Sequence, residues 1–109
     1  MAYNEEIDNR VQKIVSRWKG MVTKKMFGGV CHQQNGHILS GVIQDKLILR
    51  LGVDEAEKVL KEKDVVPFDI TGRPMKGWVM VEKNGFETEE ALKGWLGRAK
   101  TFVKTLSPK

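Results

Sequence analysis

Two short segments carry the residue types best suited to binding chemistry. They are Lys24-Lys25-Met26-Phe27-Gly28-Gly29 and Thr71-Gly72-Arg73-Pro74-Met75-Lys76-Gly77-Trp78. In the second segment, Gly72 can expose backbone N–H groups while Arg73 and Lys76 supply positive charge, which suits a phosphate or a carboxylate. Met75 and Trp78 favour a protein partner where they are exposed, because both residue types are enriched at interface cores. The structural alternative is a tight connection between two strands.

No arrangement of residues indicates catalysis or a metal site. Cys31 is adjacent to His32, but neighbouring side chains on a strand point to opposite faces, so a buried structural cysteine is favoured over a nucleophile with its base. His32 and His37 supply two ligands, whereas zinc takes three or four from the protein. A Walker loop, a dinucleotide fingerprint and a serine elbow are all absent from the sequence. We therefore expect no cofactor, no metal and no enzymatic activity.

Positive charge is concentrated at the two ends of the chain. The formal net charge is +5, with +3 in residues 1–25, −1 in residues 26–87 and +3 in residues 88–109. A basic surface can bind nucleic acid, because neutralised phosphates release their counterions. The alternative is a solvated surface, because a net charge between about 2 and 8 is common in small domains and keeps them soluble. Nucleic-acid binding through the basic terminal helices is therefore an alternative function.

The length and the composition bound the class of protein. With 109 residues, the chain is expected to form a single domain, residues 1–109, that folds without a disulfide or a metal. No apolar run approaches the roughly 18 residues that cross a membrane, so we expect no membrane partner. The start of the chain is acidic, where a secretory signal is positive and then apolar, and Cys31 stands alone. These features predict a cytoplasmic protein.

The first half of the chain predicts a helix followed by a meander of strands. Asn4 suits an N-cap, Gly20 suits a C-terminal stop, and apolar residues between them recur at helical spacing, so we expect a helix over 5–19. Runs rich in Val, Ile and Leu then predict three antiparallel strands, over residues 25–34, 37–43 and 46–51. The Asn35-Gly36 pair between the first two is the strongest short signal for a hairpin.

The second half predicts a short helix, two strands and a long helix. The short helix is expected to begin at Asp54 as its capping residue and to reach about residue 61. Strands follow over residues 65–70 and 77–82, and the last helix begins after Thr88 and extends to about residue 106. Gly94 and Gly97 inside it are expected to mark a close approach to the sheet. The whole order predicts an α+β domain with a largely antiparallel sheet.

Both faces of the predicted meander carry apolar residues. Counting from the turn pairs Cys31 with Ser40, which places Phe27, Cys31, Ile38 and Val42 on one face and Met26, Val30, Leu39 and Ile43 on the other. A sheet with one solvated face would be less apolar. The second face is therefore expected to be covered by a helix or by another copy of the chain, which would make a homodimer.

The same motifs resemble a known family. The segments that carry the resemblance are Lys24–Gly29, Asn35-Gly36, Leu49-Arg50-Leu51-Gly52, Pro67–Val79 and Ala99–Lys109, and together they resemble the N-terminal domain of the TfoX/Sxy family over almost the whole chain. The resemblance implies an α+β fold similar to secretion chaperones. It also implies a regulatory setting, because full-length members are positive regulators of bacterial competence genes that assist a transcription activator. Those members add a C-terminal helical domain, so this chain resembles a stand-alone N-terminal domain.

The sequence thus predicts a non-enzymatic, regulatory protein-interaction module. The expected contact surface contains six residues: Lys24, Lys25, Arg73, Met75, Lys76 and Trp78. The expected partner is a protein such as the transcription machinery or an activator. Besides nucleic acid, the remaining alternative is a small anion or another ligand bound by the Thr71–Trp78 loop.

Overall fold

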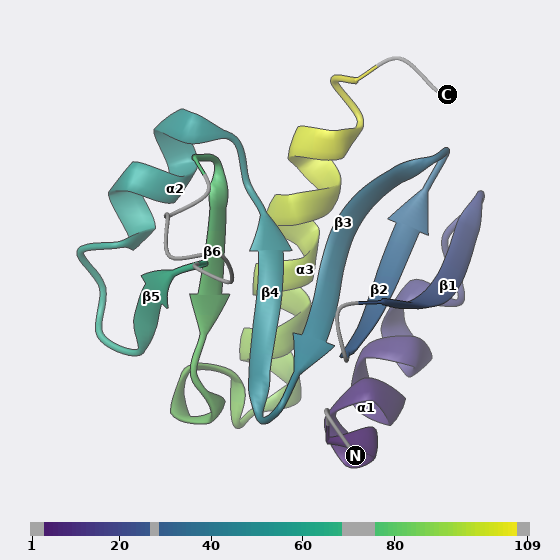
Figure 1. Cartoon of the computed structure of the whole chain (residues 1–109), viewed down its shortest axis with the longest axis horizontal. Helices are drawn as coiled ribbons and strands as arrows, with labels where there is room; N and C mark the ends of the chain where they lie inside the picture. The colour runs from purple at the N-terminus through teal and green to yellow at the C-terminus, as the bar shows by residue number, and fades with distance from the viewer. Residues whose placement is uncertain (1–3, 27–28, 69–75, 107–109) are drawn as a thin grey trace.

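One antiparallel sheet forms the body of the molecule, and helices α1 and α3 lie on one of its faces (Figure 1). The computed structural model describes residues 4–26, 29–68 and 76–106, and within them the sheet has six strands in the order β1-β2-β3-β4-β6-β5. In chain order the elements are α1 (Glu5–Val15), β1 (Met21–Met26), β2 (Gly29–Gln34), β3 (His37–Ile43), β4 (Lys46–Arg50), α2 (Val53–Val59), β5 (Val65–Pro67), β6 (Trp78–Val81), the 3-10 helix η1 (Lys83–Phe86) and α3 (Glu89–Val103). The predicted α+β class is confirmed.

The capping residues that the sequence indicated begin both long helices. The Asn4 side chain accepts hydrogen bonds from the backbone N–H groups of Glu6 and Ile7, at 2.9 and 3.2 Å. Thr88 accepts from the backbone N–H of Ala91 at 3.0 Å at the start of α3. These bonds satisfy N–H groups that have no partner inside the helix. Helix α1 is four residues shorter than predicted, because the chain tightens after Val15 into a bond between the Trp18 N–H and the Val15 carbonyl.

The meander contains one strand more than the sequence predicted. β1 is a separate strand that pairs with β2 and places Thr23 opposite His32. Its residues Thr23, Lys24 and Lys25 are exposed, and charged or polar residues are typical of an edge strand, which has no partner on one side. β1 therefore lacks the apolar pattern by which the neighbouring strands were recognised. Gly20, at φ +76°, lies in the reversal between α1 and β1.

A register shift between His32 and Gln33 corrects the predicted pairing of β2 with β3. Gln34 pairs with His37 as expected, but beyond the shift His32 pairs with Ser40, and Cys31 pairs with Gly41. A shift of one residue moves each side chain to the other face of the sheet. The predicted division of the two faces is therefore wrong.

The core lies between the sheet and the helices. Val30 and Val42 are direct cross-strand partners that both face the core, although the sequence had placed them on opposite faces. The core also takes alternate residues of β4 and β6 and the inner face of α3: Leu47, Leu49, Val79, Val81, Leu92, Leu96 and Ala99. On the other face, Cys31 and Ile48 are 6% and 3% exposed within a single chain. Their burial does not require a second copy, and the homodimer stays a prediction.

Two predictions about the helices are corrected, namely that Asp54 caps the short helix and that Gly94 and Gly97 mark a close approach to the sheet. Helix α2 begins after Gly52, at φ +86°, so Asp54 lies inside the first turn and is not the capping residue. A Cβ at Gly52 would lie 2.7 Å from the ring of Phe102, which packs against it. A Cβ at Gly94 or Gly97 would meet nothing within 4 Å, so neither glycine marks a close approach.

We expect alanine to have opposite effects at Gly52 and Gly94. Gly94→Ala should raise the free energy of unfolding by about 0.5–1 kcal/mol, because alanine favours a helix interior and finds open space there. Gly52→Ala should lower it by about 1–2 kcal/mol or more, because of the left-handed backbone and the Phe102 ring. Urea unfolding of both variants measures the difference. An equal effect of the two substitutions would contradict this account.

Candidate functional site

Two motif segments that are distant in the sequence meet where β4 ends and β6 begins. Arg50 is the cross-strand partner of Trp78. Immediately beyond this pair, the carbonyl of Gly77 accepts hydrogen bonds from the backbone N–H groups of Leu51 and Gly52, at 2.8 and 3.1 Å. Gly77 has φ +86°, and a Cβ there would lie 3.4 Å from the Gly52 backbone. The left-handed φ therefore favours glycine at position 77, whereas a Cβ there would make only an ordinary contact with the Gly52 backbone.

Aromatic rings hold the Arg50–Trp78 pair in place. The Arg50 guanidinium carbon lies 5.6 Å from the ring centroid of Trp78 and 5.6 Å from that of Phe102. Phe68 packs on Trp78 with the ring centroids 5.8 Å apart and the planes at 45°. A cation over an aromatic face contributes about 0.5–2 kcal/mol. Contacts with Arg50 and Phe68 thus fix the orientation of the partly exposed Trp78 indole.

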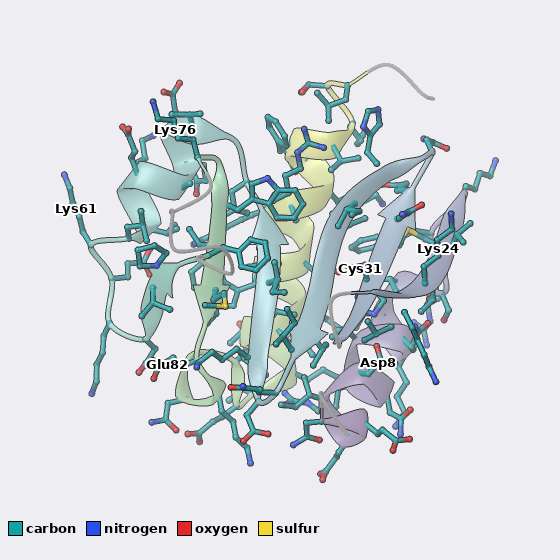
Figure 2. The ribbon with its side chains drawn as sticks, viewed as in Figure 1. Asp8, Lys24, Cys31, Lys61, Lys76 and Glu82 are labelled. Carbon is teal, nitrogen blue, oxygen red and sulfur yellow. The ribbon has the colours of Figure 1, made fainter. Side chains whose placement is uncertain are left out.

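A small apolar hollow lies beside this pair, between α2 and the strands β5 and β6. Its volume is about 160 Å³, and it is lined by Val53, Ala56, Glu57, Leu60, Pro67, Lys76, Gly77 and Trp78. We call it the α2–β6 hollow. Val53 is 47% exposed, and Lys76 is exposed at the end of the molecule where α2 lies (Figure 2). Small-molecule sites usually measure about 300–1,000 Å³, so the α2–β6 hollow suits an inserted side chain better than a whole ligand.

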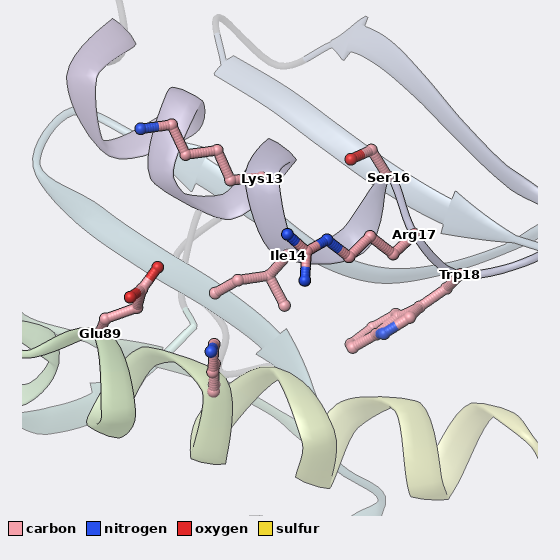
Figure 3. Close-up of a pocket in the computed structure, with 7 residues that line it drawn as sticks. Lys13, Ile14, Ser16, Arg17, Trp18 and Glu89 are labelled. Carbon is pink, nitrogen blue, oxygen red and sulfur yellow. The ribbon is translucent and has the colours of Figure 1, made fainter.

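A second, larger hollow lies on the helix side of the sheet, between α1 and α3 (Figure 3). Its volume is about 600 Å³, and it is lined by Lys13, Ile14, Ser16, Arg17, Trp18, Glu89 and Lys93. We call it the α1–α3 groove. Three of these seven side chains are cations and one is an acid. The sequence had indicated that both terminal segments are basic, and the fold places α1 and α3 side by side.

A comparison with protein families matches residues 13–103 to the TfoX N-terminal domain. The match covers nearly the whole chain. The chain belongs to the TfoX N-terminal domain family. Searches of the curated proteins and of the solved structures found no match. The close approach of Gly52 to Gly77 and the Arg50–Trp78 pair are therefore features of a TfoX N-terminal domain, formed by the segments on which the resemblance rests.

The TfoX N-terminal domain brings together two of the six residues predicted to form a contact surface. Lys76 and Trp78 both line the α2–β6 hollow. Lys24 and Lys25 are exposed on the edge strand β1, which three strands separate from β6. At a strand spacing of about 4.8 Å, β1 and β6 lie roughly 19 Å apart. Figure 2 shows Lys24 and Lys76 on opposite sides of the molecule. Arg73 and Met75 lie outside the described residues.

A buried cluster of Asp8, His32 and Ser40 was missed by the sequence analysis. His32 Nε2 lies 2.7 Å from Asp8 Oδ1, and His32 Nδ1 lies 2.8 Å from Ser40 Oγ. These residue types form the triad of many hydrolases. Here His32 and Ser40 are both 0% exposed, so no substrate can reach the Ser40 hydroxyl in this conformation. The cluster instead connects α1 to the middle of the sheet, and the register shift that aligns His32 with Ser40 left no signal in the sequence.

The lone cysteine lies on the opposite face of β2 from this cluster. Cys31 is 6% exposed, and burial raises the pKa of its thiol above the ordinary value of 9.0. Among residues 4–26, 29–68 and 76–106, no three His, Cys, Asp or Glu side chains are grouped so that they could hold a metal ion. Within the same ranges, no helix is long and apolar enough to cross a membrane.

We expect the Asp8–His32 bond to contribute measurably to stability. Asp8→Ala should lower the free energy of unfolding by about 1–3 kcal/mol, because a buried imidazole loses its partner. Glu5→Ala is the matched control, since Glu5 also lies in the first turn of α1 and supplies only its charge, worth about 0.3–1 kcal/mol there. Chemical denaturation compares the two variants. Equal losses would show that the buried bond contributes nothing beyond the helix charge.

We also expect Cys31 to react slowly in the folded protein. At pH 8 iodoacetamide should label it at least about tenfold more slowly than in urea, because burial limits access and keeps the thiol protonated. Since the raised pKa belongs to the folded state, the unfolded chain releases the thiol proton first, and stability should fall as the pH rises above about 9. Mass spectrometry measures the labelling. Labelling of the native protein at the rate of the unfolded chain would contradict the assignment.

Proposed function

We propose that this TfoX N-terminal domain is a cytoplasmic protein-interaction module with a regulatory role and no catalytic step of its own. The observation that carries the proposal is the α2–β6 hollow, with the Trp78 ring held at its wall. A rigid, partly exposed aromatic ring beside a small apolar recess is the usual setting of an interaction hot spot. The family supports a regulatory role, as expected from the resemblance to competence regulators.

The partner we propose is a protein segment that inserts an apolar side chain into the α2–β6 hollow. The volume of about 160 Å³ limits the occupant to a side chain or two. The exposed Val53 and the aromatic Trp78 offer apolar contact, while Lys76 and Glu57 supply polar groups of both signs at the same hollow. A transcription activator, the partner suggested by the family, is the natural candidate to supply such a segment.

Pre-organisation supports this choice of surface. The indole of Trp78 already packs on Phe68 and beneath the Arg50 guanidinium, so binding would not need to order it. Ordering a flexible side chain at an interface costs about 0.5–1.5 kcal/mol, and a fixed ring avoids that cost. Gly77 holds the start of β6 against the beginning of α2, so both walls of the hollow are set by the fold.

Two exposed valines allow a matched test. Peptides selected from a random library on the purified domain should share an apolar anchor residue. Val53→Asp should weaken their binding by about tenfold or more, because a charge at the hollow opposes the entry of an apolar side chain. Val22→Asp makes the same change on β1, where Val22 is 51% exposed, and should leave the affinity unchanged. Calorimetry on the folded variants gives the affinities.

A photo-crosslinker placed at position 53 and, in parallel, at position 22 then identifies the natural partner in cells. Adducts formed at position 53 but not at position 22 are expected, and the purified partner should show the same sensitivity to Val53→Asp. Equal weakening by the two aspartate variants, or selected peptides without an apolar residue, would refute the α2–β6 hollow as the contact site.

A further inference from the structure

The α1–α3 groove gathers positive charge that the fold itself does not use. Lys13 and Arg17 come from the end of α1 and the turn after it (Figure 3), and Lys93 lines the groove from α3. All three are exposed, and among the described residues none has a carboxylate within 4.0 Å. Arg10, by contrast, donates to the carbonyls of Phe86 and Glu87 at 2.7 and 3.1 Å and so serves the fold.

Three like charges around one recess repel one another, and the repulsion is relieved when an anion binds between them. Glu89 is the single acid in the lining, which leaves the groove with a surplus of two positive charges. A volume of about 600 Å³ lies within the range of true ligand sites. Arginine can hold a phosphate through two parallel hydrogen bonds, while lysines act as mobile point charges beside it.

An aromatic ring lies at the same groove. Trp18 lines it as a half-buried ring that also packs against the core, and the Nζ of Lys100 lies 4.5 Å from the centroid of this ring, which adds a fourth cation close by. Figure 3 shows the Trp18 ring extending from the α1 side toward α3, beside the Arg17 side chain. A site for single-stranded nucleic acid has two parts: cations along the path of the phosphate backbone, and an aromatic ring on which a base can stack.

We propose that the α1–α3 groove binds single-stranded nucleic acid, with Lys13, Arg17 and Lys93 contacting phosphates and Trp18 stacking on an unpaired base. A duplex offers the same phosphates, but its bases are already stacked and cannot reach Trp18. An acidic peptide offers charge without a base. The site is separate from the α2–β6 hollow and makes use of none of its residues, so either proposal can fail without the other.

The test measures the binding of a fluorescent oligo(dT) of about 16 nucleotides by anisotropy, at salt concentrations from about 50 to 200 mM. For the whole chain, affinity should fall steeply with salt. Lys13→Gln with Lys93→Gln should weaken binding by about tenfold and reduce the slope of log K against log salt by about 1.4, since each single-strand phosphate contributes about 0.7. Trp18→Leu should weaken binding by about tenfold while the slope stays unchanged.

The matched control removes the same charge elsewhere. Lys58 and Lys61 lie on and just after α2, and Figure 2 shows Lys61 at the far edge of the molecule from α1. Lys58→Gln with Lys61→Gln should leave affinity and slope close to those of the unmodified chain. Four outcomes would overturn the proposal: no binding at low salt, equal weakening by the two lysine pairs, equal affinity for poly-glutamate, or equal affinity for a duplex combined with indifference to Trp18→Leu. Circular dichroism establishes that each variant is folded.

Discussion

The carbonyl of Gly77 is the point on which the site-bearing half of the structure depends. By accepting hydrogen bonds from the N–H groups of both Leu51 and Gly52, it holds the start of β6 against the end of β4. That contact brings Arg50 opposite Trp78 and positions the first turn of α2 beside β6. Gly52 and Gly77 both have φ +86°, a backbone conformation that other residues rarely adopt, which is why both positions carry glycine.

Local chemistry made much of the fold predictable from the sequence. Asn4 and Thr88 begin their helices as expected because a short polar side chain satisfies backbone N–H groups whatever the rest of the chain does. β1 was missed because an edge strand needs no apolar pattern, and the register shift at His32 was missed because no residue type in the sequence marks it. The prediction that Asp54 caps α2 was wrong because the helix begins after Gly52, and Gly52 packs against Phe102, a residue distant in the sequence.

The candidate sites divide in the same way. Residue types suggested that Lys76 and Trp78 act together, and this is nearly a local property because Lys76 lies two residues before Trp78, the first residue of β6. The separation of Lys24 and Lys25 from them follows from the strand order, which the sequence analysis did not predict. The α1–α3 groove joins residues about eighty positions apart, so composition could indicate that both terminal segments are basic but could not show that Lys13 and Lys93 line one hollow. Asp8, His32 and Ser40 likewise meet only after α1 has packed on the sheet.

Different forces act at the two surfaces, so salt and substitutions should affect them differently. The α2–β6 hollow depends on apolar contact and fixed rings, which salt hardly affects, whereas charge in the α1–α3 groove is screened over about 8–10 Å at physiological salt. The hollow is supported by the Gly77 hydrogen bonds, and α1 is tied to the sheet through Asp8 and His32. Substitutions that share no partner and lie more than about 10 Å apart usually have additive effects. Since no residue lines both surfaces, a protein segment and a nucleic-acid strand would not compete directly for side chains of this small domain.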